Sequence, residues 1–340
     1  MKVLIYFDPK SKLDNFEGTR IRRSLKSALE YQDESYFSSP LSSGYEVVHF
    51  IDLTEINKFK KEYGKNFKFV LSLLSTEADL TIPSLFKAAT NKLEEGNFVA
   101  KRKQLEIINS VDLVFAPSEL AKKYLIEKGV TARIEVLPIP LRITRFDISL
   151  NPLKTAIFSH FQFPEETKLI VSVIDYRDEA AFEKIKKLAE KFPKYKFICI
   201  SHTTNRNHLS IRFRNNLKKI PRNLLFIEPL TNDLYSSLLY NASIFVSCNS
   251  NYGNDIEVYE AMVSKTQILA LKGSIFEDIA IDKENAYVYN SFDALIDGID
   301  SFFNERMELT IEKAAQFCKK ASYKSIGVDL IKFYKELEGE

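Results

Sequence analysis

Residues 167–201 read TKLIVSVIDYRDEAAFEKIKKLAEKFPKYKFICIS, and this stretch predicts a strand, a helix and a second strand in that order. LIVSVI is a nearly unbroken apolar run, which is typical of a strand buried on both faces of a sheet. EAAFEKIKKLAEKF repeats its apolar residues at helical spacing, and KFICIS is apolar again. A helix between two buried strands is the unit from which parallel sheets are built.

The same alternation of short apolar runs and longer helical patterns extends along the chain in both directions. Toward the C-terminus, strands are expected at NLLFIE, SIFVS and QILALK, with helices near residues 232–241 and 255–264. Toward the N-terminus, strands are expected at VLIYF, EVVHFI, FKFVLSLL, DLVFAP and RIEVLP, with helices near residues 20–30, 83–109 and 118–129. The alternation predicts an α/β fold with parallel sheets covered by helices.

At 340 residues the chain is longer than one hydrophobic core usually supports, so two domains are expected. The connection between them is placed within residues 141–167, where two prolines interrupt the pattern. We expect doubly wound, Rossmann-like domains at residues 1–150 and 165–310, and a helical tail at 311–340, interrupted near Gly327, that closes the chain and packs back across them. Two facing sheets of this kind would bind ligands at the carboxyl ends of their strands, in the cleft between the domains.

Composition and charge exclude several classes of protein. Hydrophobic residues make up 45% of the chain and charged residues 28%, as in ordinary globular domains. A net charge of +2, without any recognition-module signature, argues against a nucleic-acid partner. No apolar run suits a signal peptide or a membrane span, so a cytoplasmic protein is expected. The cysteines lie far apart in or beside apolar runs, which predicts buried, reduced thiols and no metal site: Cys199, Cys248 and Cys318.

The stretch SNYGNDIEVYEAMVSKTQILA, residues 250–270, follows the expected strand SIFVS and carries the strongest chemical signal. A glycine in the loop and a helix starting near Asp255 leave backbone amides exposed, which suits an anion such as a nucleotide diphosphate. Glu260, one to two turns into the helix, could accept hydrogen bonds from both hydroxyls of a ribose. A capped strand, loop and helix without a ligand explains these residues equally well. The donor contacts predicted from the stretch are Gly253, Asn254, Asp255, Ile256 and Glu260.

The same stretch resembles the signature of retaining GT-B glycosyltransferases of family 4. In that signature two glutamates, separated by seven residues, flank a glycine-containing loop and are followed by an alanine. Gly253, Glu260 and Ala261 match it, whereas Tyr252 stands where the first glutamate is expected. The resemblance implies catalytic candidates at Tyr252 and Glu260.

Other segments resemble a narrower group, the diacylglycerol and glucosyl-diacylglycerol glucosyltransferases of bacteria. LSTEADL, residues 74–80, is similar to their acceptor-side motif, and SHTTNRNHLSIRFRNNLKKIPRNLLFIEPL and KASYKSIGVDLIKFYKEL are similar to later segments. The resemblance covers nearly the whole chain. It implies a donor-nucleotide domain in the C-terminal half and acceptor contacts in the N-terminal half from Ser75, Thr76, Glu77 and Asp79.

Three sites depart from the pattern of this family. After the first strand of the second domain, relatives hold the donor diphosphate with Arg and Lys, but here Val173 and Asp178 stand near those positions. Arg177 could bind the phosphates instead, or be an exposed, ion-paired arginine.

Relatives also carry a histidine before the acceptor motif, for which His49 is the nearest substitute and a third catalytic candidate, although a packing role is the commoner one for a histidine in a strand. Their glycine-rich first loop is reduced here to DNFEGTRIRR, where Gly18 alone would let the backbone approach the donor.

Basic residues cluster at 203–223 and at 20–26, in RIRRSLK. Such clusters can hold a peripheral protein on the anionic inner face of a membrane, and they can equally be solvated helix faces.

The leading hypothesis is a glycosyltransferase that moves a hexose, glucose in the resemblance, from a UDP-linked donor to a lipid or other hydroxyl acceptor, without metal or other cofactor. Its rival is a catalytically degenerate GT-B protein that serves as partner or scaffold subunit of an active transferase. A dinucleotide oxidoreductase is disfavoured, because no G-x-G-x-x-G follows an expected strand.

Overall fold

The computed structural model describes residues 2–6, 15–51, 53, 55–73, 102–148, 153–174, 178–201, 215, 217–248, 256–272 and 279–339. These residues fall into two units, each built on its own parallel sheet. Unit 1 comprises Met1–Pro140 and Ala321–Glu340, and unit 2 comprises Leu141–Ser250 and Asp255–Lys320. The prediction of an α/β fold with two parallel sheets is therefore confirmed.

The sheet of unit 1 has five named strands, all parallel and adjacent in chain order. They are β1 (Val3–Tyr6), β2 (Val47–Phe50), β3 (Lys68–Ser72), β4 (Leu113–Ala116) and β5 (Arg133–Val136). Phe37 extends the sheet on the far side of β1: its amide donates to the Val3 carbonyl at 2.7 Å, and its carbonyl accepts from the Ile5 amide at 3.1 Å. The chain thus runs from β1 to Phe37 on one side and returns to β2 on the other. This reversal makes unit 1 doubly wound.

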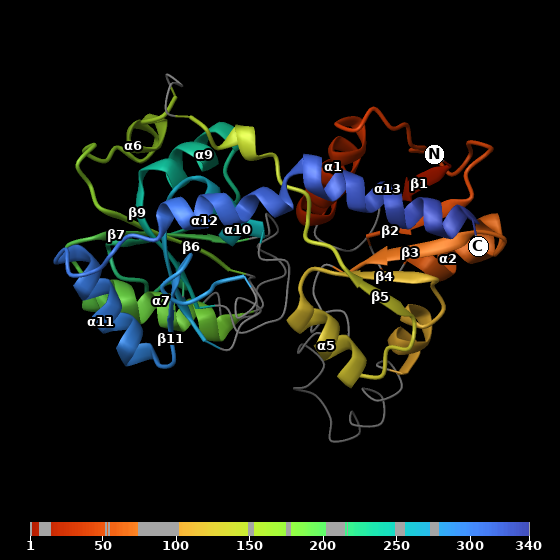
Figure 1. Cartoon of the computed structure of the whole chain (residues 1–340). Coiled ribbons are helices and arrows are strands. Elements are labelled where there is room, and N and C mark those ends of the chain that lie inside the picture. Colours follow the sequence, from red (N-terminus) through yellow and green to blue (C-terminus); the bar gives the residue numbers. More distant parts are fainter. Residues whose placement is uncertain are drawn as a thin grey trace. The chain divides into compact units, whose positions relative to one another are not determined.

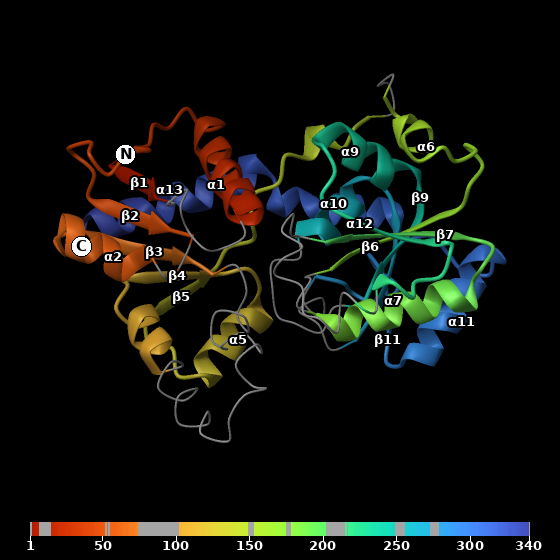
Figure 2. The ribbon, with the colours of Figure 1, turned by 180° about the vertical axis from the view of Figure 1, so that it is seen from behind.

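Helices cover both faces of this sheet, as right-handed crossovers in two directions require. On one face, α1 (Asn15–Glu30) packs its Ile21 and Leu25 against Val47 and Val70. On the other face, α2 (Glu55–Tyr63) packs its Phe59 against Phe50, with ring centroids 5.4 Å apart. The helix α5 (Glu119–Glu127) joins β4 to β5. Figures 1 and 2 show α1 and α13 together on one face and α5 on the other.

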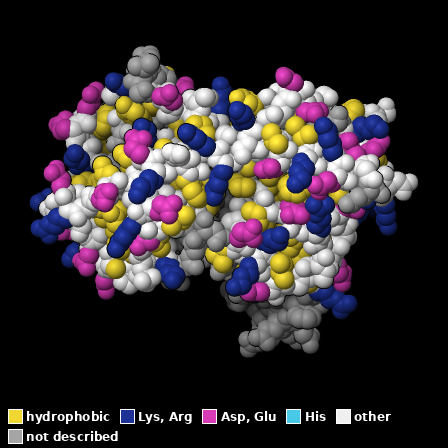
Figure 3. Space-filling view, viewed as in Figure 1, with side chains coloured by type: hydrophobic (Ala, Val, Ile, Leu, Met, Phe, Trp, Pro, Cys, Tyr) yellow, Lys and Arg dark blue, Asp and Glu magenta, His cyan; other side chains and the backbone are white. Residues whose placement is uncertain are grey.

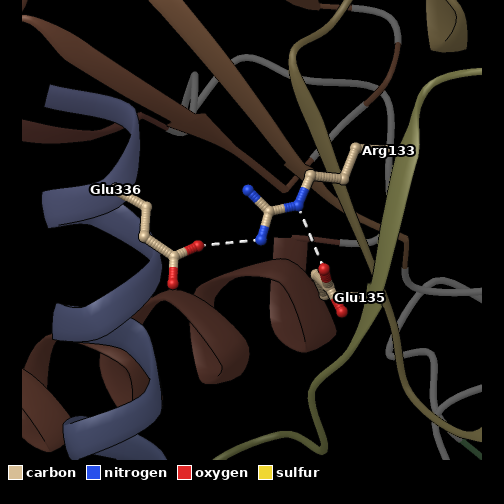
Figure 4. Close-up of polar contacts among 3 residues, drawn as sticks. All are labelled: Arg133, Glu135 and Glu336. Carbon is tan, nitrogen blue, oxygen red and sulfur yellow. Dashed lines mark hydrogen bonds and ion pairs between the residues drawn. The ribbon is translucent and has the colours of Figure 1, made fainter. Parts of the chain in front are cut away.

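The last helix of the chain, α13 (Tyr323–Gly339), completes unit 1 by packing on α1 and β2. Ile326, Leu330 and Tyr334 point into the core that α1 shares with the sheet. Near the C-terminal end of α13, Glu336 Oε2 lies 2.8 Å from Nη2 of Arg133, a residue of β5. The Nε of Arg133 also lies 3.0 Å from Glu135 Oε1 (Figure 4). Because these charges are part-exposed, the apolar contacts contribute most to the docking.

Gly327 lies inside α13, so the expected break of the tail at this glycine is wrong. The tail instead breaks at a 3-10 turn, Cys318–Ala321, before α13 begins. A Cβ on Gly327 would lie 2.5 Å from the carbonyl oxygen of Ala28 in α1. The glycine therefore permits a close approach of two helices rather than a change of direction.

We expect Gly327→Ala to lower the free energy of unfolding by about 1 to 3 kcal/mol, because the new methyl meets backbone that cannot rotate away. Urea denaturation followed by circular dichroism measures the change. Gly339→Ala in the same helix is the matched control, since a Cβ there has nothing within 4 Å. Equal stability of wild type and Gly327→Ala would contradict the close packing.

The sheet of unit 2 has six parallel strands in the spatial order β11-β10-β9-β6-β7-β8. They are β6 (Leu169–Ile174), β7 (Lys196–Ser201), β8 (Leu224–Ile227), β9 (Ala242–Ser247), β10 (Gln267–Leu271) and β11 (Tyr287–Tyr289). Counted from β6, this is the 3-2-1-4-5-6 order of dinucleotide-binding folds. The order reverses between β6 and β9.

Helices of unit 2 also cover both faces of the sheet. The apolar side chains of α7 (Glu179–Lys191) and α11 (Phe292–Phe303) share one core with alternate residues of β6, β7 and β9. On the opposite face lie α9 (Asn232–Asn241) and α10 (Ile256–Val263), with α12 (Ile311–Phe317) against α10 (Figures 1 and 2). The short helix α6 (Ala156–Phe161) packs on α9, after a 3-10 turn at Ile143–Arg145.

Candidate functional site

The strand order of unit 2 reverses between β6 and β9, the two strands that precede the loops singled out by the sequence. β6 ends at Ile174 and its neighbour β9 ends at Ser247, and the two strands are parallel, so both loops leave from the same edge of the sheet. In open α/β sheets, ligands bind at this kind of reversal, beyond the carboxyl ends of the strands.

Most of the predicted donor contacts belong to these loops. Ile256 and Glu260 lie among the described residues, and the following lie outside them: Tyr252, Gly253, Asn254, Asp255 and Arg177.

The helix α10, which follows the loop after β9, is buried along nearly its whole length. It packs between the sheet and α12, where the carbonyl of Tyr259 accepts a hydrogen bond from Cys318 Sγ at 3.5 Å. Glu260 stands in its second turn and is only 1% exposed. A carboxylate is seldom buried in a helix unless polar groups or a ligand compensate its desolvation. Glu260 is therefore a buried carboxylate and not a surface charge.

Two buried polar residues of β9 and α10 were not singled out from the sequence. Glu257, one turn before Glu260, is also buried. In the sequence, an acidic residue within an otherwise apolar helix could have marked this position. Ser247, the last residue of β9, is 2% exposed, and its Oγ has no hydrogen-bond partner among the residues that the structure describes. Because Val246 and Cys248 face the α7 side, Ser247 faces the α10 side. In the sequence, a serine at the end of an apolar strand, just before the loop, could have marked Ser247.

Asp178 has a structural function at the other side of the reversal. Its Oδ1 accepts a hydrogen bond from the Ala181 amide at 2.9 Å, so it is the N-cap of α7. Val173, at the end of β6, is buried and apolar. At the two positions where the resemblance implies cations, the chain thus has the N-cap residue of α7 and a buried apolar residue.

We expect Asp178→Ala to cost about 1 kcal/mol of folding free energy, because one first-turn amide of α7 loses its acceptor. Asp178→Ser should restore most of the loss. Thermal and chemical unfolding of the two variants measures the difference, and a full loss in Asp178→Ser would show that the cap is not the cause.

His49 is not placed to act on a substrate. It has no exposed surface, its Nδ1 lies 2.6 Å from the Tyr334 hydroxyl of α13, and its Nε2 lies 2.8 Å from Ser72 Oγ of β3. Burial lowers the pKa of His49 from 6.5 to about 3, so the ring is neutral at physiological pH. These two contacts make His49 a packing residue of unit 1, and it is therefore no longer a catalytic candidate.

Gly18 lies in the first turn of α1 and not in a loop, which corrects its expected setting. In a helix that begins at Asn15, the amide of the fourth residue is the first that can donate to a carbonyl four residues earlier, so Gly18 does not supply one of the free amides of the helix N-terminus. The acceptor-side candidates Ser75, Thr76, Glu77 and Asp79 follow β3 in sequence and lie outside the described residues.

The three cysteines are free and buried, as predicted. Desolvation raises the pKa of Cys248 and of Cys318 to about 12 each, so neither is a thiolate nucleophile. Within the described ranges, no three His, Cys, Asp or Glu side chains are grouped as metal ligands would be.

None of the described helices is both long and apolar enough to span a bilayer. On the face seen in Figure 3, Lys and Arg side chains lie among Asp and Glu side chains rather than in a field of one sign.

No protein-family model and no curated protein matches the chain. Solved structures match it over nearly its whole length. Sucrose-phosphate synthase from Thermosynechococcus elongatus is 13% identical, with a TM-score of 0.69 and coverage of 98% of this chain and 81% of that chain. Anabaena HepE in complex with UDP and glucose is 12% identical, with a TM-score of 0.72 and coverage of 99% and 100%. A glycosyltransferase from Rickettsia africae is 15% identical, with a TM-score of 0.66 and coverage of 98% of both chains. At these identities the likeness shows the fold alone, and the fold is that of GT-B glycosyltransferases.

Proposed function

We propose that this chain is a retaining glycosyltransferase that moves a hexose, glucose first among the candidates, from a nucleotide sugar such as UDP-glucose to a lipid or other hydroxyl acceptor. The observation that carries the proposal is the burial of Glu260 in the helix that starts beside the reversal of strand order in unit 2. The HepE structures, solved with UDP and with UDP-glucose, support the class of donor.

Unit 2 would bind the donor with its own backbone and one carboxylate. Amides in the first turn of α10 suit the diphosphate, because a helix N-terminus carries partial positive charge and donors without helical partners. Glu260 would accept hydrogen bonds from the ribose hydroxyls. The further donor contacts that we propose are Gly253, Asn254, Asp255, Ile256 and Arg177, with Tyr252 beside the reacting sugar. Amides and a guanidinium carry a diphosphate without a metal, so the proposal needs no cofactor.

Unit 1 would bind the acceptor through the segment after β3, which holds Ser75, Thr76, Glu77 and Asp79. A lipid acceptor places the protein on the inner face of the membrane. In the basic stretch 203–223, the side chains of Lys218, Lys219 and Arg222 are exposed, which supports contact with anionic headgroups.

The rival function is that of a degenerate partner or scaffold subunit for an active transferase. Asp178 favours it, because a carboxylate capping α7 occupies the place where relatives put a cation.

Release of UDP from UDP-glucose, measured with and without diacylglycerol vesicles, separates the two functions. Turnover that is lost in Glu260→Ala supports the transferase. Binding of UDP without turnover favours the partner, and absence of both binding and turnover overturns the donor site itself.

A further inference from the structure

A pair of cations on α1 has a placement that the proposed donor site does not explain. Arg22 and Lys26 are four residues apart, so they lie on one face of the helix. Their neighbours Ile21 and Leu25 are buried in the core of unit 1. Arg22 and Lys26 are only half-buried, whereas Arg23 is exposed. The basic run RIRRSLK is therefore not one solvated surface.

Both cations donate hydrogen bonds to Ser38, the residue that follows Phe37. Arg22 Nη2 donates a long hydrogen bond of 3.4 Å to the Ser38 carbonyl, and Lys26 Nζ donates to Ser38 Oγ at 2.7 Å. Lys26 Nζ also lies 5.0 Å from the centre of the Tyr36 ring. One guanidinium and one ammonium group together offer eight hydrogen-bond donors, and the bonds to Ser38 use two of them.

Burial acts on the charge of both cations, and the nearby carboxylates of Glu55 and Glu30 oppose its effect only in part. The Nε of Arg22 is buried and has no hydrogen-bond partner among the described residues. The negative charge of Glu55 attracts Arg22, yet burial outweighs it and lowers the pKa of Arg22. Burial and the charge of Arg22 lower the pKa of Lys26 to about 8, against the opposite effect of Glu30. Glu30 in turn accepts a hydrogen bond from the Tyr36 hydroxyl at 2.5 Å.

We propose that Arg22 and Lys26, with the Ser38 hydroxyl, form a binding site in unit 1 for a phosphate group. A guanidinium and an ammonium one helical turn apart, close to a hydroxyl, offer the charge-assisted donors that tetrahedral oxyanions accept. The phosphate belongs to a soluble phosphate ester or to a phospholipid headgroup, since both present the same oxygens.

Inorganic phosphate is the first probe, titrated into the full chain and followed by calorimetry. We expect saturable binding that weakens about tenfold or more in Arg22→Gln and in Lys26→Gln, because each variant loses a charge-assisted bond. Arg22→Lys, which keeps the charge, should lose less. Arg23→Gln is the matched control on the same helix, and circular dichroism checks that every variant is folded.

Two further titrations locate the source of the phosphate and separate this site from the donor site. Glycerol 3-phosphate that binds through Arg22 and Lys26 supports a soluble ligand, and binding only to phosphatidylcholine vesicles containing phosphatidic acid, with the same dependence, supports a headgroup. UDP affinity should be unchanged in Arg22→Gln. No saturable binding of any of these probes, or an equal loss in Arg23→Gln, would overturn the site.

Discussion

Glu260→Gln is expected to weaken the binding of UDP by about 10-fold to 100-fold while leaving the fold intact. Glutamine has nearly the shape of glutamate, so the buried volume of α10 is preserved. The variant loses the negative charge that strengthens two hydrogen bonds from ribose hydroxyls, and it keeps only one acceptor oxygen. Isothermal titration calorimetry with UDP and with UDP-glucose measures the effect.

Glu257→Gln is the matched control for this prediction, because Glu257 is a buried carboxylate in the same helix. We expect it to change UDP affinity by less than about threefold, within the range of an indirect effect. If the two substitutions weakened UDP equally, the helix as a whole and not Glu260 would be responsible.

Acid is expected to destabilise unit 1 through His49, at up to about 1.4 kcal/mol for each pH unit below the ordinary pKa of histidine. The pKa of His49 falls from 6.5 to about 3 on folding. Between these values the unfolded chain binds a proton on this ring and the folded chain does not. Stability is therefore complete above about pH 6.5 and is lost as the pH falls toward 3.

The test compares the pH dependence of unfolding in wild type and in His49→Gln. The free energy of unfolding of the wild type should fall by about 2 kcal/mol more than that of the variant from about pH 7 to about pH 5. Carboxylates titrate in both proteins, so their contributions cancel. Parallel slopes for wild type and His49→Gln would show that His49 is not held neutral by burial.

The sequence predicted the architecture well, because its strands are buried on both faces and their apolar runs are distinct. The expected strands at 167–174 and 196–201 correspond to β6 and β7, and those in SIFVS and QILALK correspond to β9 and β10. Strand order could not be predicted, because the apolar pattern carries no information on which strands are neighbours. The reversal between β6 and β9 is a property of the fold, and it makes neighbours of the two strands that precede the candidate loops.

Local sequence reasoning failed where tertiary contacts decide the role of a residue. Gly327 was expected to interrupt a helix, because glycine is a poor helix former. It lies within α13 instead, where the close contact with Ala28 leaves no room for a Cβ. The neighbours of His49 come from β3 and from α13, almost three hundred residues away in the chain. From the sequence, Asp178 was only a departure from the cationic pattern of the family, and the structure shows the amide of α7 that it caps.

The site in unit 2 can be tested directly by hydrogen–deuterium exchange of the full chain with and without UDP. We predict that saturating UDP slows exchange in peptides covering residues 174–181 and 248–262, the two segments that flank the reversal of strand order. Unchanged exchange in both segments at saturating UDP, or protection only elsewhere in the chain, would contradict a nucleotide-sugar site beside Glu260.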